Sequence, residues 1–106
     1  MVSATHLDDL ERLVQSRQKA SPDTSYTAQL FAEGVPVCAR KFGEEAVETI
    51  IAATTGSTDE LVRESADLLY HWIVLLAARG VSADRVYDEL ARRAGTSGLD
   101  EKSTRR

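Results

Sequence analysis

Gly56 and Ser57 interrupt the longest helix-favouring stretch of this chain, and this interruption constrains the fold more than any other feature. Upstream, Pro36 suits the first position of a long helix that is expected to end near Thr55, with Gly56 as its C-cap. Downstream, Ser57 and Glu60 have the spacing of a capping box, which opens a second long helix. Two long helices with so short a connection are expected to lie antiparallel, side by side.

Two shorter helices are expected before this pair. The first begins with Thr5 as N-cap and runs for about 14 residues. The segment KASPDTS then favours a turn. A short helix follows from Tyr26 to Glu33, with Ser25 or Thr24 as its cap and Gly34 as its end. The first helix carries its apolar residues on one stripe: Leu7, Leu10, Leu13 and Val14.

The C-terminal part of the chain predicts a fifth helix. The second long helix should end before Gly80, and Ser82 caps a helix that continues to about Ala94, where Gly95 ends it. Residues 96–106 are polar and are expected to form a flexible tail. The sequence contains no alternating strand pattern and no internal linker, so residues 1–106 are expected to form a single all-α domain.

Length and charge exclude several classes of protein. With 106 residues, the chain has room for one modest core, which oligomerisation would help to stabilise. The longest apolar run has 11 residues, too few to cross a bilayer. The net charge of −4 argues against a nucleic-acid-binding surface. The single cysteine, Cys38, excludes a disulfide framework and suits the cytoplasm. The acidic, amphipathic N-terminus resembles neither a signal peptide nor a transit peptide.

Carboxylates stand directly beside apolar residues in both long helices. At about 100° per residue, four charged residues of the first helix fall within an arc of roughly 100°: Lys41, Glu44, Glu45 and Glu48. The second helix carries an even narrower polar stripe: Glu60, Glu64, Asp67 and His71. Beyond Asp67 this helix is apolar almost all round, so Asp67 is expected close to the core and His71 deeper.

Facing helices would bring one pair of carboxylates, Glu45 and Glu48, against another, Glu64 and Asp67. Four converging carboxylates repel one another strongly at neutral pH, and a hard divalent cation is the simplest remedy. Oxygen ligands alone favour Mg²⁺, with Mn²⁺ as a substitute, over zinc. The alternative is a solvated acidic face balanced by nearby Arg or Lys, and Glu44 and Glu60 fit that alternative. The residues by themselves therefore indicate a helical protein that binds a divalent cation.

The stretches KFGEEAVE and ESADLLYH resemble the acidic motif of the all-α nucleoside triphosphate pyrophosphatases, the MazG-like superfamily. Three further stretches narrow the resemblance to the phosphoribosyl-ATP pyrophosphatase family: SYTAQLFAEG, DLLYHWIVLLAARGVSADRVYDELARR and the terminal SGLDEKSTR. Phe42, Trp72 and Asp100 depart from the usual family pattern, but none of them belongs to the acidic motif.

The resemblance implies Mg²⁺-dependent hydrolysis of 1-(5-phosphoribosyl)-ATP to phosphoribosyl-AMP and pyrophosphate, the second step of L-histidine biosynthesis. By motif position, the metal ligands are Glu45, Glu48, Glu64 and Asp67. The catalytic carboxylates are Glu44, Glu45 and Glu48, of which Glu44 lies on the rim and holds water or a second ion. The phosphate-binding residues are Lys41, Lys102 and Arg105; an ordinary surface lysine and a basic tail are the alternatives.

The aromatic residues and His71 are expected to have structural roles. Tyr26, Tyr70 and Trp72 are placed in the core or an interface rather than in a base-stacking platform. His71 is expected as a hydrogen-bonded core histidine, with a supporting role behind a metal-binding carboxylate as the alternative.

The second long helix carries more apolar surface than one neighbouring hairpin covers. We therefore expect a homodimer in which helix pairs from two chains form a four-helix core. Two other functions stay open at this stage: a housekeeping nucleoside triphosphate pyrophosphatase, which the terminal SGLDEK disfavours, and a non-enzymatic helical interaction module.

Overall fold

A computed structural model describes residues 5–94, and these residues form an all-α domain without strands. Its helices are α1 (Thr5–Ser16), the 3-10 turn η1 (Arg17–Lys19), α2 (Tyr26–Glu33), α3 (Val35–Thr55), α4 (Thr58–Ala78) and α5 (Ala83–Arg93). The predicted fold class and the predicted order of helices are confirmed. None of the described helices is both long enough and apolar enough to cross a membrane.

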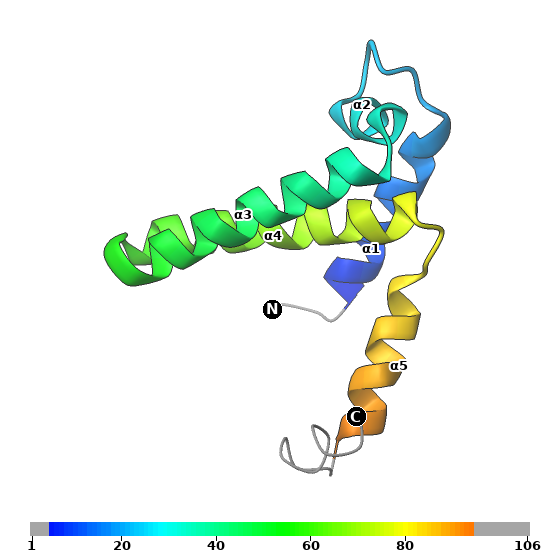
Figure 1. Cartoon of the computed structure of the whole chain (residues 1–106). Coiled ribbons are helices and arrows are strands. Elements are labelled where there is room, and N and C mark those ends of the chain that lie inside the picture. Colours follow the sequence, from blue (N-terminus) through cyan, green and yellow to red (C-terminus); the bar gives the residue numbers. More distant parts are fainter. Residues whose placement is uncertain (1–4, 95–106) are drawn as a thin grey trace.

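Helices α3 and α4 form the predicted antiparallel hairpin and lie side by side along their length (Figure 1). The connection is so tight that a Cβ atom on Gly56 would stand only 2.9 Å from the backbone oxygen of Ala52, so a side chain at this position would require a shift of the backbone. The capping box is present: the Ser57 hydroxyl accepts from the Glu60 backbone N–H, and the Glu60 carboxylate accepts from that of Ser57, each at 3.1 Å. These local contacts end one helix and begin the next.

The other helix boundaries also follow local signals. Ser25 caps α2, and Gly34 ends that helix with a φ of 93°, a conformation that favours glycine. Because Gly34 is also the N-cap of α3, Pro36 occupies the second position of that helix rather than the first. Ser82 caps α5 as predicted. The side chain of Thr5 and the whole of Gly95 lie outside the described residues.

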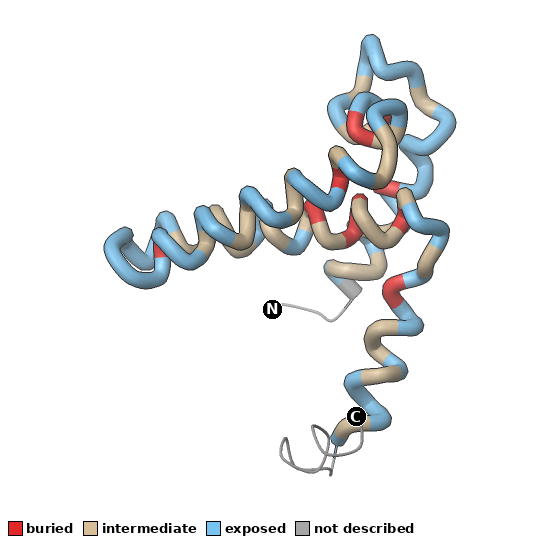
Figure 2. The backbone as a smooth tube through the Cα atoms, viewed as in Figure 1, coloured by how far each residue is buried: buried red, intermediate tan, exposed pale blue. Residues whose placement is uncertain are grey.

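The core lies where α1 and α2 meet the same end of the hairpin, as Figure 2 shows. Its buried members are Val14, Leu30, Cys38, Ile73, Val74, Ala77 and Ala83. Helix α4 supplies three of these seven residues, more than any other helix, which matches its nearly all-round apolar sequence beyond Asp67. Tyr70 and Trp72 pack against this core, as expected.

The outer part of the hairpin and helix α5 extend away from this core (Figure 1). The predicted apolar stripe of α1 is only partly correct, since Val14 is buried whereas Leu13 is 50% exposed. Tyr26 is likewise not in the core of the protomer, because 51% of its surface is exposed. Further large apolar side chains are exposed along the hairpin: Val47, Ile50, Ile51, Val62 and Leu69.

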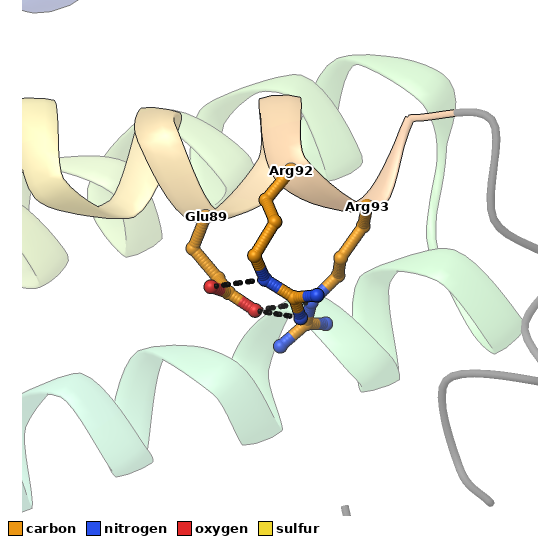
Figure 3. Close-up of polar contacts among 3 residues, drawn as sticks. All are labelled: Glu89, Arg92 and Arg93. Atoms are coloured by element: carbon orange, nitrogen blue, oxygen red, sulfur yellow. Dashed lines mark hydrogen bonds and ion pairs between the residues drawn. The ribbon is translucent and has the colours of Figure 1, made fainter. Parts of the chain in front are cut away.

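Helix α5 carries a cluster of ion pairs near its C-terminal end (Figure 3). The Glu89 carboxylate accepts hydrogen bonds from Arg92 at 2.7 and 3.0 Å and from Arg93 at 2.9 Å. These bonds hold the pKa of Glu89 down at about 2. At the other end of α5, the buried Ala83 donates its backbone N–H to the Glu11 carboxylate of α1 at 2.7 Å. This bond ties the start of α5 to the core.

Candidate active site

Three carboxylates from the two long helices converge on the hairpin. One oxygen each from Glu45 of α3 and from Glu64 and Asp67 of α4 lies within 4.8 Å of the others. We call these three residues the acidic cluster. Glu45 and Glu64 are partly buried, whereas Asp67 is exposed. The expectation that Asp67 lies close to the core is therefore wrong, because burial of this face of α4 begins only at His71, one helical turn later.

A threonine beside the cluster joins the two helices. The Thr49 hydroxyl lies 2.8 Å from the backbone oxygen of Glu45, one turn earlier in α3, and 3.2 Å from that of Glu64 in α4. The second contact holds the backbone of α4 against α3 at Glu64, whose side chain belongs to the acidic cluster. No sequence pattern singles out Thr49, because its role depends on the register between the helices.

The cluster is electrostatically unfavourable as it stands. Partial burial raises the pKa of Glu64, and the negative charge of Glu45 raises it further. The charges of Glu48 and Asp67 act in the same direction. In addition, Oε2 of Glu45 is buried and has no hydrogen-bond partner among the described residues. A hard cation would satisfy that oxygen and remove the repulsion, so these residues fit a metal ion bound by oxygen ligands.

Glu48 stands apart from the three clustered carboxylates. It is exposed, and the close group contains Glu45, Glu64 and Asp67 without it. The predicted convergence of two carboxylate pairs is therefore only partly realised. Glu48 nevertheless remains near, since its charge contributes to the raised pKa of Glu64. It lies one helical turn beyond Glu45, at the margin of the cluster.

Glu44 lies outside the acidic cluster and is paired with basic residues of its own helix. Its carboxylate stands 3.6 Å from Arg40 Nε and 3.7 Å from Lys41 Nζ, and all three side chains are largely exposed or half-buried. Exposed pairs of this kind contribute little to stability. The arrangement leaves Lys41 as a cation at the edge of the acidic site, close enough to act on His71.

His71 is buried as expected, with 7% of its surface exposed. Its Nδ1 is buried and has no hydrogen-bond partner among the described residues, so the expected hydrogen-bonded core histidine is not realised on that side of the ring. Burial lowers its pKa, which favours the neutral imidazole. His71 instead contacts two aromatic rings, those of Tyr26 and Tyr70.

Two of the residues that the sequence assigns to phosphate binding belong to the C-terminal segment of the chain. Lys102 and Arg105 lie outside the described residues, as does the whole segment 95–106. The described part of the predicted site therefore consists of the acidic cluster, Glu48 at its margin, and the Glu44 and Lys41 pair beside it.

Comparison with known proteins gives a consistent result over nearly the whole chain. Residues 7–94 match the protein family described as Phosphoribosyl-ATP pyrophosphohydrolase. A protein of Erythrobacter litoralis named Phosphoribosyl-ATP pyrophosphatase is 59% identical over 93% of this chain and 95% of its own length. Proteins of the same name from Parvibaculum lavamentivorans and Rhodobacter capsulatus are 55% and 56% identical, over 96% and 95% of this chain and 94% and 98% of their own lengths.

Proposed function

Because this chain belongs to the phosphoribosyl-ATP pyrophosphohydrolase family, we propose that its acidic cluster is the centre at which 1-(5-phosphoribosyl)-ATP is hydrolysed. The enzyme is a hydrolase of histidine biosynthesis. Water attacks at phosphorus, the bond between the α and β phosphates breaks, and the products are phosphoribosyl-AMP and pyrophosphate. The observation that carries the assignment of the site is the convergence of Glu45, Glu64 and Asp67 within 4.8 Å.

The cofactor that suits this cluster is Mg²⁺, with Mn²⁺ as a substitute, because every available ligand is a carboxylate oxygen. Glu45, Glu64 and Asp67 would hold the ion, and Glu48 at the margin would complete the set of protein ligands. Bound there, the ion would neutralise phosphate charge, polarise the phosphoanhydride and lower the pKa of a water molecule. The buried, unpaired Oε2 of Glu45 supports this assignment, since a buried carboxylate oxygen requires a partner.

Glu45 and Glu48 thus act in catalysis by holding the ion, whereas Glu44 acts differently in this proposal. Glu44 is not consumed in the cluster, so its carboxylate is available to orient the attacking water and accept its proton. Its contacts with Arg40 and Lys41, at 3.6 and 3.7 Å, are long enough to be exchanged for a water molecule when substrate binds. By accepting that proton Glu44 becomes neutral, and because its side chain is exposed the proton can then pass to bulk water.

Basic residues are proposed to receive the phosphates. Lys41 is one turn before Glu45, and its ammonium group lies 3.7 Å from the Glu44 carboxylate on a partly exposed side chain, which favours contact with a phosphate oxygen. The family resemblance of the terminal segment assigns a similar role to Lys102 and Arg105. We place the enzyme in the cytoplasm, where its buried free thiol, Cys38, would stay reduced.

We also propose a homodimer. Five large apolar side chains of α3 and α4 are exposed, which is unfavourable in water: Val47, Ile50, Ile51, Val62 and Leu69. Pairing with the hairpin of a second chain would cover this surface and give a four-helix core. The proposed site, which lies on the same uncovered part of the hairpin, would then be close to the interface.

The function is tested by measuring pyrophosphate release from phosphoribosyl-ATP, ATP and deoxynucleoside triphosphates, with Mg²⁺ and with a chelator. We expect phosphoribosyl-ATP to be cleaved at least about tenfold more efficiently than the others, a difference of about 1.4 kcal/mol in transition-state binding. Equal cleavage of ATP would indicate a general nucleoside triphosphate pyrophosphatase instead. An absence of cleavage of every nucleotide would leave only the helical interaction module.

A further inference from the structure

Three rings cluster at the junction of α2 and α4, beside the proposed active site. Tyr26, the first residue of α2, stacks on Tyr70 of α4 with ring centroids 6.5 Å apart and planes inclined by 22°. His71 lies edge-on to both, at 6.3 Å from Tyr26 and 4.9 Å from Tyr70. We call these three residues the aromatic cluster. Its outermost member, Tyr26, is 51% exposed and so presents ring surface to solvent.

The cluster is held in place by contacts on both helices. The Tyr70 hydroxyl is hydrogen-bonded to the Thr27 hydroxyl of α2, and the Ser25 side chain caps α2 directly before Tyr26. On the other side, His71 is 7% exposed and packed into the protein. The aromatic surface is therefore preorganised, and binding to it costs little side-chain entropy.

The aromatic cluster adjoins the acidic cluster. His71 follows Asp67 by one helical turn, a separation of about 6 Å along the axis of α4. The carboxylates of Asp67 and Glu44 raise the pKa of His71 against the larger lowering effect of burial, so both lie within electrostatic reach of the imidazole. A ligand whose phosphates reach Asp67 can therefore extend along α4 toward His71 and Tyr26.

The substrate of the proposed reaction differs from ATP in the charge of its purine. Attachment of a ribosyl group at N1 turns the adenine into a more basic amidine, which carries a proton and a positive charge near neutral pH, whereas the adenine of ATP is neutral. Tyrosine faces attract cations placed over them.

We propose that Tyr26 and Tyr70, supported by His71, form the subsite that receives the cationic N1-substituted adenine ring and distinguishes it from the neutral ring of ATP. This inference rests on the proposed function, because it assigns a part of the same substrate to residues outside the acidic motif. It makes Tyr26 a specificity-determining residue, and His71 a positioning residue that acts through the two tyrosine rings.

The test compares cleavage of 1-methyl-ATP, which carries the ring charge without the phosphoribosyl group, with cleavage of ATP. For the unaltered enzyme we expect kcat/KM to be about tenfold higher for 1-methyl-ATP, with most of the difference in KM. Tyr26→Leu keeps apolar volume but removes the ring, and it should bring this ratio close to one. Tyr26→Phe is the matched control and should keep the ratio, because the face of the ring remains.

Three results would overturn the inference in distinguishable ways. If the unaltered enzyme cleaves phosphoribosyl-ATP but treats 1-methyl-ATP and ATP alike, the aromatic subsite fails while the proposed function stands. If it does not cleave phosphoribosyl-ATP, the proposed function itself fails. If Tyr26→Leu changes the sedimentation coefficient of the native protein while the ratio is kept, Tyr26 is an interface residue and the subsite assignment is wrong.

Discussion

The Thr49 hydroxyl of α3 lies 3.2 Å from the backbone carbonyl oxygen of Glu64 in α4, so the side chain of one helix holds the other at a residue of the acidic cluster. The same hydroxyl lies 2.8 Å from the carbonyl oxygen of Glu45, the clustered carboxylate of its own helix. Thr49 therefore sets the spacing between the two carboxylates through the backbones of Glu45 and Glu64 rather than through their side chains.

Replacing Thr49 by Val should loosen this spacing. The loss of the bond between the helices, in a partly buried place, should lower the free energy of unfolding by about 1 kcal/mol. It should also weaken the binding of Mn²⁺, because Glu45 and Glu64 are held less firmly. Urea unfolding and titration calorimetry measure the two effects. Thr54→Val is the matched control, since Thr54 is exposed and its hydroxyl contacts only carbonyl oxygens of its own helix, those of Ile50 and Ile51. Equal effects of the two substitutions would show that the contact with Glu64 is unimportant.

Replacing Glu45 by Gln separates repulsion from metal binding. Without metal, the variant should unfold at the same temperature as the unaltered protein or higher, because a neutral amide does not repel Glu64. With Mg²⁺ or Mn²⁺, the unaltered protein should gain stability through binding, and the variant should gain little. Hydrolysis should fall by more than about 100-fold. Both effects are measured as the midpoint temperature of thermal unfolding, with and without the ion. A Glu45→Gln protein that gains as much from Mn²⁺ as the unaltered chain would contradict the assignment of the cluster.

The raised pKa of Glu64 gives the metal-free protein a defined pH dependence. Because the folded state binds this proton more tightly than the unfolded chain, the contribution to stability is full below the ordinary pKa of 4.5 and is lost as pH rises through the raised value. We expect Glu64→Gln to lack this component of the pH profile. NMR titration of the side-chain carboxyl groups measures the shift directly, and saturation with Mg²⁺ should reverse its direction.

Glu89 is an internal control in the same titration. Its hydrogen bonds to Arg92 and Arg93 place its pKa at about 2, so its contribution to stability is present above 4.5 and is lost as pH falls toward 2. The two glutamates should therefore titrate on opposite sides of the ordinary value. A Glu64 that titrates at or below 4.5 in the metal-free protein would mean that the three carboxylates do not converge in solution.

Replacing Glu44 by Gln tests its proposed role in orienting water. Because Glu44 lies outside the acidic cluster and is paired with Arg40 and Lys41, the affinity for Mn²⁺ should stay within about twofold of normal. If its carboxylate accepts the proton of the attacking water, kcat should nevertheless fall by about 100-fold. Asp67→Asn should differ by losing metal affinity and activity together. Full activity in Glu44→Gln would identify Glu44 as one member of an ordinary surface ion pair.

The exposed apolar hairpin predicts the outcome of a charge substitution. Ile50 is 61% exposed in the protomer, so Ile50→Glu should leave the fold of one chain intact. If the hairpin is covered by a second chain, the buried carboxylate would be strongly unfavourable and the dimer should dissociate. Sedimentation velocity at micromolar concentration measures this, and Gln15→Glu, an exposed change on α1, is the control. A monodisperse monomer for the unaltered protein would remove the dimer proposal.

The helix boundaries were readable from the sequence because they depend on residues close together in the chain. Ser57 and Glu60 cap α4 through their own backbone groups, and Gly34 ends α2 by adopting a conformation that favours glycine. The polar stripe of α4 was equally readable, since helical periodicity alone places Glu64 and Asp67 on one face. These features require no knowledge of which helix packs against which.

Only the tertiary structure decided which carboxylates meet. Glu48 shares the face of Glu45 but remains outside the cluster, Asp67 is exposed although its helix is mostly apolar, and Thr49 joins the backbones of two helices. Each of these facts depends on the register and depth at which α3 lies against α4, and that register is set by packing across the whole hairpin. The sequence therefore determined the helices and their acidic faces, whereas the packing between the helices determined the geometry of the site.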